Sequence, residues 1–218
     1  MAKIQPTFEE RLNHENSVIF NSFKTPYHIQ EFLDSIPYVG EELNRSPLLV
    51  MQDRQSHCLD GGLLAALALR KIGYSARIID LVPEPGIDDD HVLAIYKING
   101  LYGAIAKSNF VGLRFREPVY SSIRELVMTY FDVFFNVEGI KTLRGYTRPI
   151  DLDLYDRFNW QTELSGVNKV VDRLYSLKMV PVIKPEFIEK LNKMDPRSLE
   201  AGMMGVNMDG LYKAGQKH

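Results

Sequence analysis

The chain has 218 residues, of which 45% are hydrophobic and 25% charged, and its formal net charge is -2. These are ordinary values for a globular protein, so we expect a packed core in one domain with an extension. The near balance of charge lacks the basic footprint that binders of polyanions carry, and nucleic acid is therefore not expected as a partner.

The sequence also bears on membranes and on cysteine chemistry. Residues 1–10 contain no apolar run after their lysine, and nowhere do about 18 consecutive apolar residues occur, as a spanning helix would require. We therefore expect a cytoplasmic protein with no membrane partner. The single cysteine, Cys58, cannot form an internal disulfide or a multi-thiolate metal site, so any chemical role must use a lone thiol.

The first half of the chain contains the strongest predicted helix. Residues 1–25 show only a weak helical period and are interpreted as a peripheral N-terminal arm. Apolar residues then fall at helical spacing over residues 27–36, where Pro37 stops the pattern. The next helix is predicted over residues 58–72 and ends with basic residues before Gly73. Because it is apolar nearly all round, we expect it to be the buried central helix of a domain.

The middle of the chain predicts antiparallel strands. Three strands are predicted, over residues 75–82, 91–98 and 101–106. Asn99-Gly100, between the last two, is a strong hairpin signal because both central residues of a type I′ turn need positive φ. Helical spacing returns over residues 121–135. The order of helix, antiparallel strands and helix predicts an α+β core over residues 26–136.

The C-terminal third, residues 137–218, is predicted to pack on the core as an extension. Its patterns indicate a strand over 142–154, helices over 167–177 and 185–191, and a helix that starts at Asp195-Pro196. Asp195 would be the N-cap of that last helix, and Pro196 suits its first turn. The tail from Gly202 is expected to be loop.

Cys58 and His91 are the candidate chemical pair. A helix N-terminus lowers the pKa of a thiol and favours the nucleophilic thiolate, although a lone cysteine at the head of an apolar helix is often core filler. His91 follows three aspartates and opens a strand, where its ring could project at a rim. The alternative is a strand-end histidine that neighbouring carboxylates satisfy. Gln52, six residues before Cys58, is a candidate donor to a developing oxyanion.

These residues resemble a known family. The segments that carry the resemblance are Cys58-Leu59-Asp60-Gly61, Arg70-Lys71-Ile72-Gly73-Tyr74-Ser75-Ala76-Arg77, Asp90-His91-Val92 and Asn99-Gly100. In this order they resemble the transglutaminase-like superfamily, relatives of papain-type cysteine proteases, over roughly residues 48–136. The resemblance implies a papain-like core in which a buried helix packs on an antiparallel sheet. It also implies Cys58 as nucleophile and His91 as general base, without a metal or an organic cofactor.

One position departs from the family pattern. An Asp on the next strand orients the His in the family, and this chain has Ala106 at the expected position. If Ile98 pairs with Leu101 across the turn, His91 lies opposite Ser108 and Ala106 is its diagonal neighbour on the same face. Alanine cannot hold an imidazole in one tautomer. Loss of the orienting carboxylate in a serine triad costs about four orders of magnitude in turnover.

Three substitutes for the missing carboxylate stay open. Ser108 has the predicted face, and Asn109 has suitable chemistry if a bulge shifts it by one residue. One of Asp88 to Asp90 could also reach the ring from the preceding loop, and Ser108 and Asn109 are placed slightly ahead. His57 suggests a metal site with Cys58 and His91, but zinc sites usually use three or four protein ligands, so no metal is predicted.

Two functions follow as hypotheses. The first is an enzyme in which Cys58 attacks an amide or thioester carbonyl of a peptide, protein or small substrate, His91 serves as base and then acid, and Gln52 helps to hold the oxyanion. The second, motivated by Ala106, is a catalytically inactive transglutaminase-like protein that binds or scaffolds a protein or peptide in the same cleft. The enzyme is slightly favoured because Cys58, Gln52 and His91 are present. The substrate, the acyl acceptor and the oligomeric state stay open.

Overall fold

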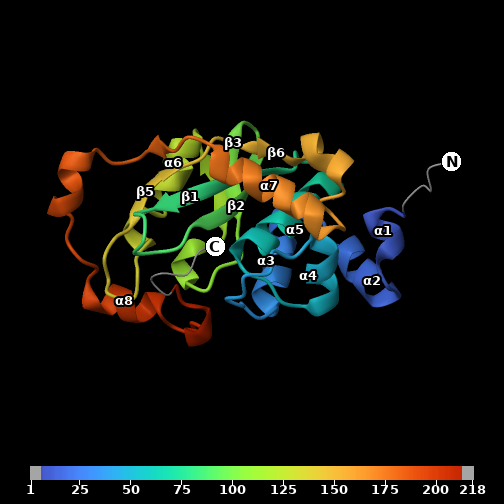
Figure 1. Ribbon diagram of the computed structural model, residues 1–218, viewed down its shortest axis with the longest axis horizontal. Helices are drawn as coiled ribbons and strands as arrows, with labels where there is room; N and C mark the ends of the chain where they lie inside the picture. The colour runs from blue at the N-terminus through green and yellow to red at the C-terminus, as the bar shows by residue number, and fades with distance from the viewer. Residues whose placement is uncertain (1–5, 213–218) are drawn as a thin grey trace.

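The computed structural model describes residues 6–212, which form an α+β fold with one seven-stranded sheet (Figure 1). The helices are α1 (Phe8–Arg11), α2 (His14–Ser22), α3 (Pro26–Ser35), α4 (Pro47–Asp53), α5 (Cys58–Lys71), α6 (Ile123–Met128), α7 (Leu164–Ser176) and α8 (Pro196–Gly202). The strands are β1 (Arg77–Pro83), β2 (His91–Ile98), β3 (Leu101–Ile105), β4 (Arg116–Tyr120), β5 (Leu143–Tyr146), β6 (Ile150–Asp151) and β7 (Val180–Pro181). None of the helices in this range is long and apolar enough to cross a membrane.

The sheet confirms the predicted hairpin and its register. Its strand order is β4-β3-β2-β1-β5-β7, β6 pairs with β1, and neighbouring strands are antiparallel. Ile98 pairs with Leu101, as predicted. Asn99 and Gly100 have φ values of 50° and 86°, which a type I′ turn requires. The strands β4 and β7 lie in segments for which no strand is predicted.

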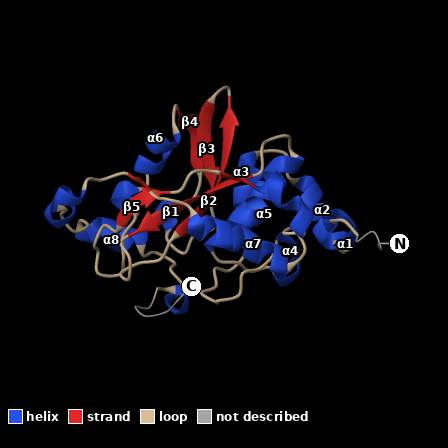
Figure 2. Ribbon diagram, turned by 45° about the horizontal axis from the view of Figure 1, so that its top comes forward, coloured by secondary structure: helices blue, strands red, loops and turns tan. Residues whose placement is uncertain are grey.

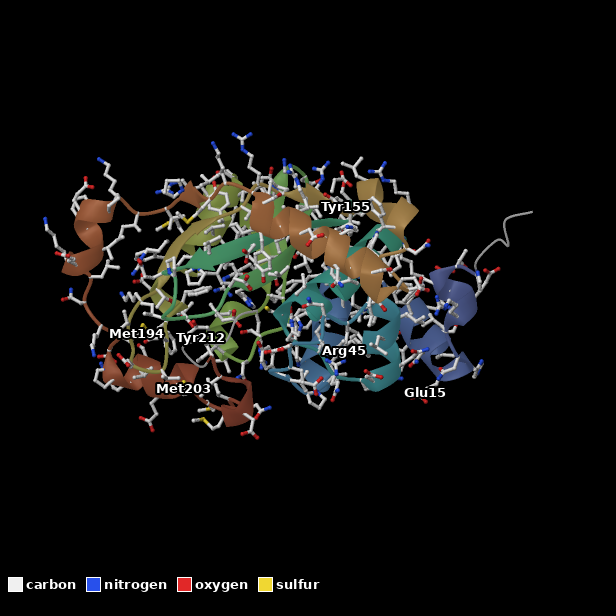
Figure 3. All side chains as sticks on the ribbon, in the orientation of Figure 1. Glu15, Arg45, Tyr155, Met194, Met203 and Tyr212 are labelled. Atoms are coloured by element: carbon white, nitrogen blue, oxygen red, sulfur yellow. The ribbon has the colours of Figure 1, made fainter. Side chains whose placement is uncertain are left out.

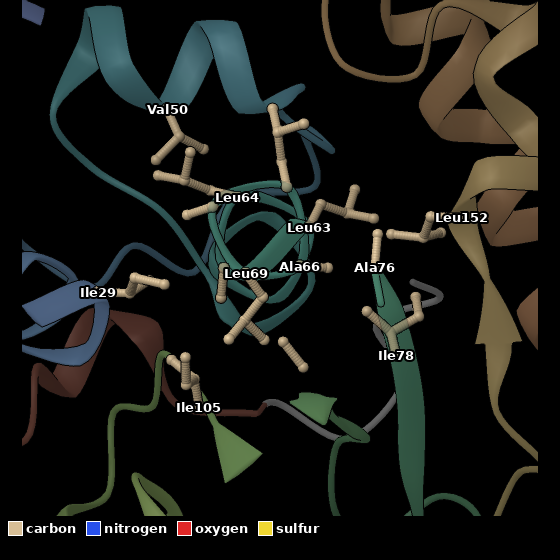
Figure 4. Packing of buried hydrophobic residues seen from close by; sticks show 14 of the residues in the cluster. Ile29, Val50, Leu63, Leu64, Ala66, Leu69, Ala76, Ile78, Ile105 and Leu152 are labelled. Carbon is tan, nitrogen blue, oxygen red and sulfur yellow. The ribbon is translucent and has the colours of Figure 1, made fainter. Parts of the chain in front are cut away.

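Helix α5 is the centre of the core, as its apolar sequence predicts. Figure 4 looks along this helix and shows buried side chains on every side of it, among them Leu63, Leu64 and Leu69. Gly62 allows the helix to approach β2 closely, because a Cβ atom there would lie 2.8 Å from Cγ1 of Val92. The face of the sheet that carries Val92 is therefore the face that α5 covers.

The two faces of the sheet belong to two separate apolar clusters. Figure 2 shows α3, α4, α5 and α7 grouped to one side of the strands, with α6 on the other. Along β2, Val92, Ala94 and Tyr96 belong to the cluster around α5. Leu93 and Ile95 belong to the second cluster, which includes residues of α6. Successive side chains of a strand point to opposite faces, so every residue of β2 can be assigned to one side.

The N-terminal arm is more integrated than its weak period indicates. Phe8 and Phe20 are buried in the same cluster as α5, and their rings meet edge to face with centroids 4.9 Å apart. Thr7 forms a capping box with Glu10 at the start of α1, and Asn13 caps α2. The two short helices therefore cover one end of the core. The first five residues of the arm and the last six of the chain lie outside the described range.

The helix predicted over residues 121–135 is shorter in the structure. Helix α6 ends at Met128, and a 3₁₀ turn follows over Phe131–Val133. Arg116, on β4, donates from Nε to Oγ1 of Thr129 and from Nη2 to the carbonyl of Thr129. The guanidinium of Arg116 thus bonds a carbonyl that would accept a backbone hydrogen bond if the helix continued. Tyr130 and Phe134, which follow, are buried in the second cluster without helical geometry.

The C-terminal extension follows its predicted elements in part. Helix α7 matches the expected helix, and Asp195 caps α8 by accepting from the backbone N–H groups of Arg197 and Ser198. The strand predicted over residues 142–154 is divided into β5 and β6, and a 3₁₀ helix over Leu152–Phe158 follows. The helix predicted over residues 185–191 is a 3₁₀ helix, Pro185–Lys190.

Candidate functional site

Cys58 lies where the sequence predicts, as the first residue of α5. His57 is the N-cap: its Nδ1 accepts from the backbone N–H of Leu59 at 3.2 Å. Asp60 completes a capping box by accepting from the N–H of His57 and also accepts from the N–H of Arg45 at 2.7 Å. The start of the helix is thus held by a buried carboxylate and an imidazole, which position the cysteine backbone.

The thiol is held in its neutral form. Its side chain is buried, and the sulfur donates to the carbonyl oxygen of Asp90 at 3.8 Å. Burial raises the pKa of Cys58 well above its ordinary value, the charges of Asp90 and Asp89 raise it further, and the backbone N–H of Val92 only partly opposes them. The helix N-terminus predicts the opposite direction, but desolvation and two nearby carboxylates outweigh it.

His91 is buried in a different contact. Its Nε2 lies 2.7 Å from the carbonyl oxygen of Leu113, and because a carbonyl only accepts, Nε2 carries the proton. The ring meets Phe134 edge to face at 6.5 Å between centroids. Burial lowers the pKa of His91 to about 4, so the imidazole is neutral at pH 7.

The thiol and the imidazole are hydrogen-bonded to different backbone carbonyls, those of Asp90 and Leu113. His91 shares its strand face with Leu93 and contacts Phe134, and both of these residues belong to the second cluster. Cys58 belongs to α5, which packs on the face of Val92. The thiol thus contacts the backbone on either side of His91, at Asp90 and Val92, whereas the ring of His91 packs on the face of Leu93.

The remaining sequence candidates are dispersed. Gln52 is exposed on α4, outside the residues that line the cavities next to Cys58 and His91. Ser108 is buried beside the cavity of His91, and its hydroxyl accepts from the N–H of Phe110 at 3.0 Å. Ala106 is buried on the face of His91, as the register predicts, and the amide of Gln30 bonds both its N–H and its carbonyl.

Asn109 and the aspartate loop, residues 88–90, have partners other than the imidazole of His91. Asn109 hydrogen-bonds twice with the backbone of Asn207, which lies 98 residues further along the chain. The hydroxyl of Thr142 donates to Asp88, and burial raises the pKa of Asp88 to about 6. The nitrogen of His91 that faces Leu113 is thus oriented by a backbone carbonyl.

Two cavities flank this part of the molecule. One, of about 260 Å³, is lined by His91 together with Ser108, Asn109 and Phe134. The other, of about 310 Å³, opens beside Cys58 and carries acidic side chains from the segment after α3 and from the aspartate loop. Six residues line both cavities and separate them: Tyr38, Asp89, Asp90, Gly210, Leu211 and Tyr212.

The buried carboxyl of Asp80 escaped the sequence analysis. It lies on β1, its Oδ1 has no hydrogen-bond partner in the described part of the chain, and burial raises its pKa well above the ordinary value, with Asp90 as the next cause. Asp80 also raises the pKa of Cys58, so it is a third acidic side chain, after Asp90 and Asp89, that disfavours the thiolate. The sequence signal that could have found Asp80 is its place inside the apolar run of β1, because aspartates are rarely buried without a partner.

Within residues 6–212, no group of three His, Cys, Asp or Glu side chains is arranged to hold a metal ion. A comparison with protein-family models found no match for the chain, and a comparison with curated proteins also found none.

Proposed function

We propose that this chain is a cytoplasmic protein with a transglutaminase-like core, and that it binds a peptide or protein segment beside Cys58 without turning it over. The observation that carries the proposal is that Cys58 and His91 each bond a different backbone carbonyl, the thiol that of Asp90 and the imidazole that of Leu113. A general base must come within hydrogen-bond reach of the proton that it removes. With Nε2 of His91 bonded to Leu113, only Nδ1 could serve as the base, and among the described residues no hydrogen bond joins it to Cys58.

The chemistry of the thiol supports the same conclusion. Thiolate is the nucleophilic form, and burial together with Asp89 and Asp90 favours the protonated thiol of Cys58. The oxyanion donor that the enzyme hypothesis requires is also displaced, because Gln52 is exposed on α4. What remains is a cleft with hydrogen-bonding walls and an inert thiol, which suits recognition of a peptide or protein.

Thiol labelling separates this function from the enzyme hypothesis. Iodoacetamide at pH 7 should modify Cys58 no faster than it modifies N-acetylcysteine, as measured by intact mass, because the thiol is neutral and shielded. The variant His91→Gln should label at the same rate as the wild type. Cys58→Ala is the control, since it removes the single cysteine and should show no modification.

Two results together would establish the enzyme in place of the binding protein. They are a labelling rate for Cys58 above that of the model thiol and loss of this excess in His91→Gln. That outcome would mean that the imidazole reaches the thiol in solution and lowers its pKa.

A further inference from the structure

Residues 206–212, here called the strap, cross between the cavities of Cys58 and His91. Gly210, Leu211 and Tyr212 line both cavities. Figure 3 shows Met203, directly after α8, near the edge of the molecule and Tyr212 further toward the middle of the view. A segment from the end of the chain thus lies at the place where the resemblance expects a substrate.

Asn109 holds the strap by its backbone. The side-chain Oδ1 of Asn109 accepts from the N–H of Asn207 at 2.8 Å, and its Nδ2 donates to the carbonyl of Asn207 at 2.9 Å. A neighbouring β-strand would make the same pair of bonds, and any residue other than proline offers them. The contact therefore recognises a backbone N–H and carbonyl at the residue that begins the 3₁₀ turn over Met208–Gly210, which Gly210 closes by donating to the same carbonyl.

The opposite wall of the cleft adds two contacts. The Nδ2 of Asn207 donates to the carbonyl of Tyr38 at 3.0 Å. Gly40 and Gly210 approach so closely that a Cβ atom on Gly40 would lie 2.6 Å from Cα of Gly210. This wall thus selects a glycine three residues after the one that Asn109 reads.

The strap has few apolar anchors. Residues 207–209 are exposed, and Met208 keeps 64% of its surface in contact with solvent. The apolar burial lost if the strap left the cleft would come from Val206, Leu211 and Tyr212, which are only half-buried, and the free energy of burial scales with the area removed from water. The side-chain amide of Asn109 and the carbonyl of Tyr38 would then become available to another chain.

We propose that the strap is a built-in occupant of a peptide-binding cleft, and that a peptide from another molecule competes for the same place. The ligand class is a peptide that forms a 3₁₀ turn, with asparagine at the residue that Asn109 bonds and glycine three positions later. The inference rests on the proposed function, since it names the segment that the cleft recognises. Departure of the strap joins the two cavities into one longer cleft.

The test uses the full chain with a released strap. Asn207→Pro removes the N–H that Asn109 accepts, at a φ of -74° that proline tolerates, and Gly210→Val places a Cβ 3.0 Å from Cδ1 of Tyr38. The double variant leaves the walls of the cleft unchanged. The probe is a fluorescent peptide with the sequence of residues 203–212, and the readout is its anisotropy.

We expect the probe to bind the double variant at least about tenfold more tightly than the wild type, whose own strap competes at an effective concentration on the order of millimolar. Adding Asn109→Ala to the double variant should weaken binding by about tenfold or more, because two hydrogen bonds are lost. Met208→Ala, an exposed change on the strap, is the matched control and should leave the wild-type affinity unchanged.

Equal affinity of the probe for the wild type and the double variant would overturn the inference, and so would an Asn109→Ala substitution without effect. Far-UV circular dichroism of each variant checks that the fold is retained. Failure here is distinct from failure of the proposed function, because slow labelling of Cys58 does not depend on the strap sequence.

Discussion

Protonation of His91 should destabilise the fold in a pH range that the structure defines. The ordinary pKa of a histidine is 6.5, and burial lowers that of His91 to about 4. Between these values the unfolded chain binds a proton that the folded chain does not. The stability contributed by the neutral form of His91 is therefore fully present above pH 6.5 and is lost as the pH falls toward 4. At pH 5 the loss amounts to about 2 kcal/mol, from 1.5 pH units at about 1.4 kcal/mol each.

The variant His91→Gln isolates this contribution. A glutamine amide can still donate to the carbonyl of Leu113, but it does not titrate. At pH 7.5 the variant should be less stable than the wild type, because it loses the packing of the ring against Phe134. We expect the difference in unfolding free energy to shift by about 2 kcal/mol in favour of the variant between pH 7.5 and pH 5. Urea unfolding followed by the fluorescence of Trp160, the single and buried tryptophan, measures it.

The comparison between variants is needed because Asp88 acts in the opposite direction. Burial raises its pKa to about 6, so the folded chain takes up that proton first, and acidification from pH 6 toward 4 adds stability. Asp88 is present in both proteins and largely cancels in the difference. The exposed Val18→Ala, which changes no titratable group, serves as control and should show the same difference in unfolding free energy at both pH values. A difference between wild type and His91→Gln that is the same at both pH values would refute the reasoning.

Two further predictions concern the packing around α5. Lys107→Met should lower the unfolding free energy, measured by urea titration, by about 2–3 kcal/mol, because the buried ammonium bonds two carbonyls at the end of α3 that would lose their partner. The control, the exposed Lys178→Met, should change it by less than about 0.5 kcal/mol in the same titration. Gly62→Ala should lower the unfolding free energy by about 1–3 kcal/mol despite the better helix propensity of alanine. Calorimetry of the double variant with Val92→Ala should show that part of this loss is recovered, because Val92→Ala removes the atom that the new Cβ meets. Strictly additive effects of the two substitutions would contradict the contact.

Local rules predicted the elements that position the candidate residues. The apolar run from Cys58 to Lys71 predicts a helix that can only be stable when surrounded, and α5 is surrounded. Asn99-Gly100 predicts the hairpin and its register, because few residues other than these adopt positive φ without strain. Asp195 predicts the start of α8 for a similarly local reason, the free N–H groups of the first turn.

The sequence alone therefore determined a buried helix headed by Cys58 and an antiparallel hairpin that begins with His91. Only the tertiary structure decided on which side of the sheet the imidazole lies. Strand β2 is apolar on both faces, so its alternation carries no information about which face meets α5. The place of the strap was equally hidden, because it depends on hydrogen bonds between Asn109 and Asn207 that form only after the whole chain has packed.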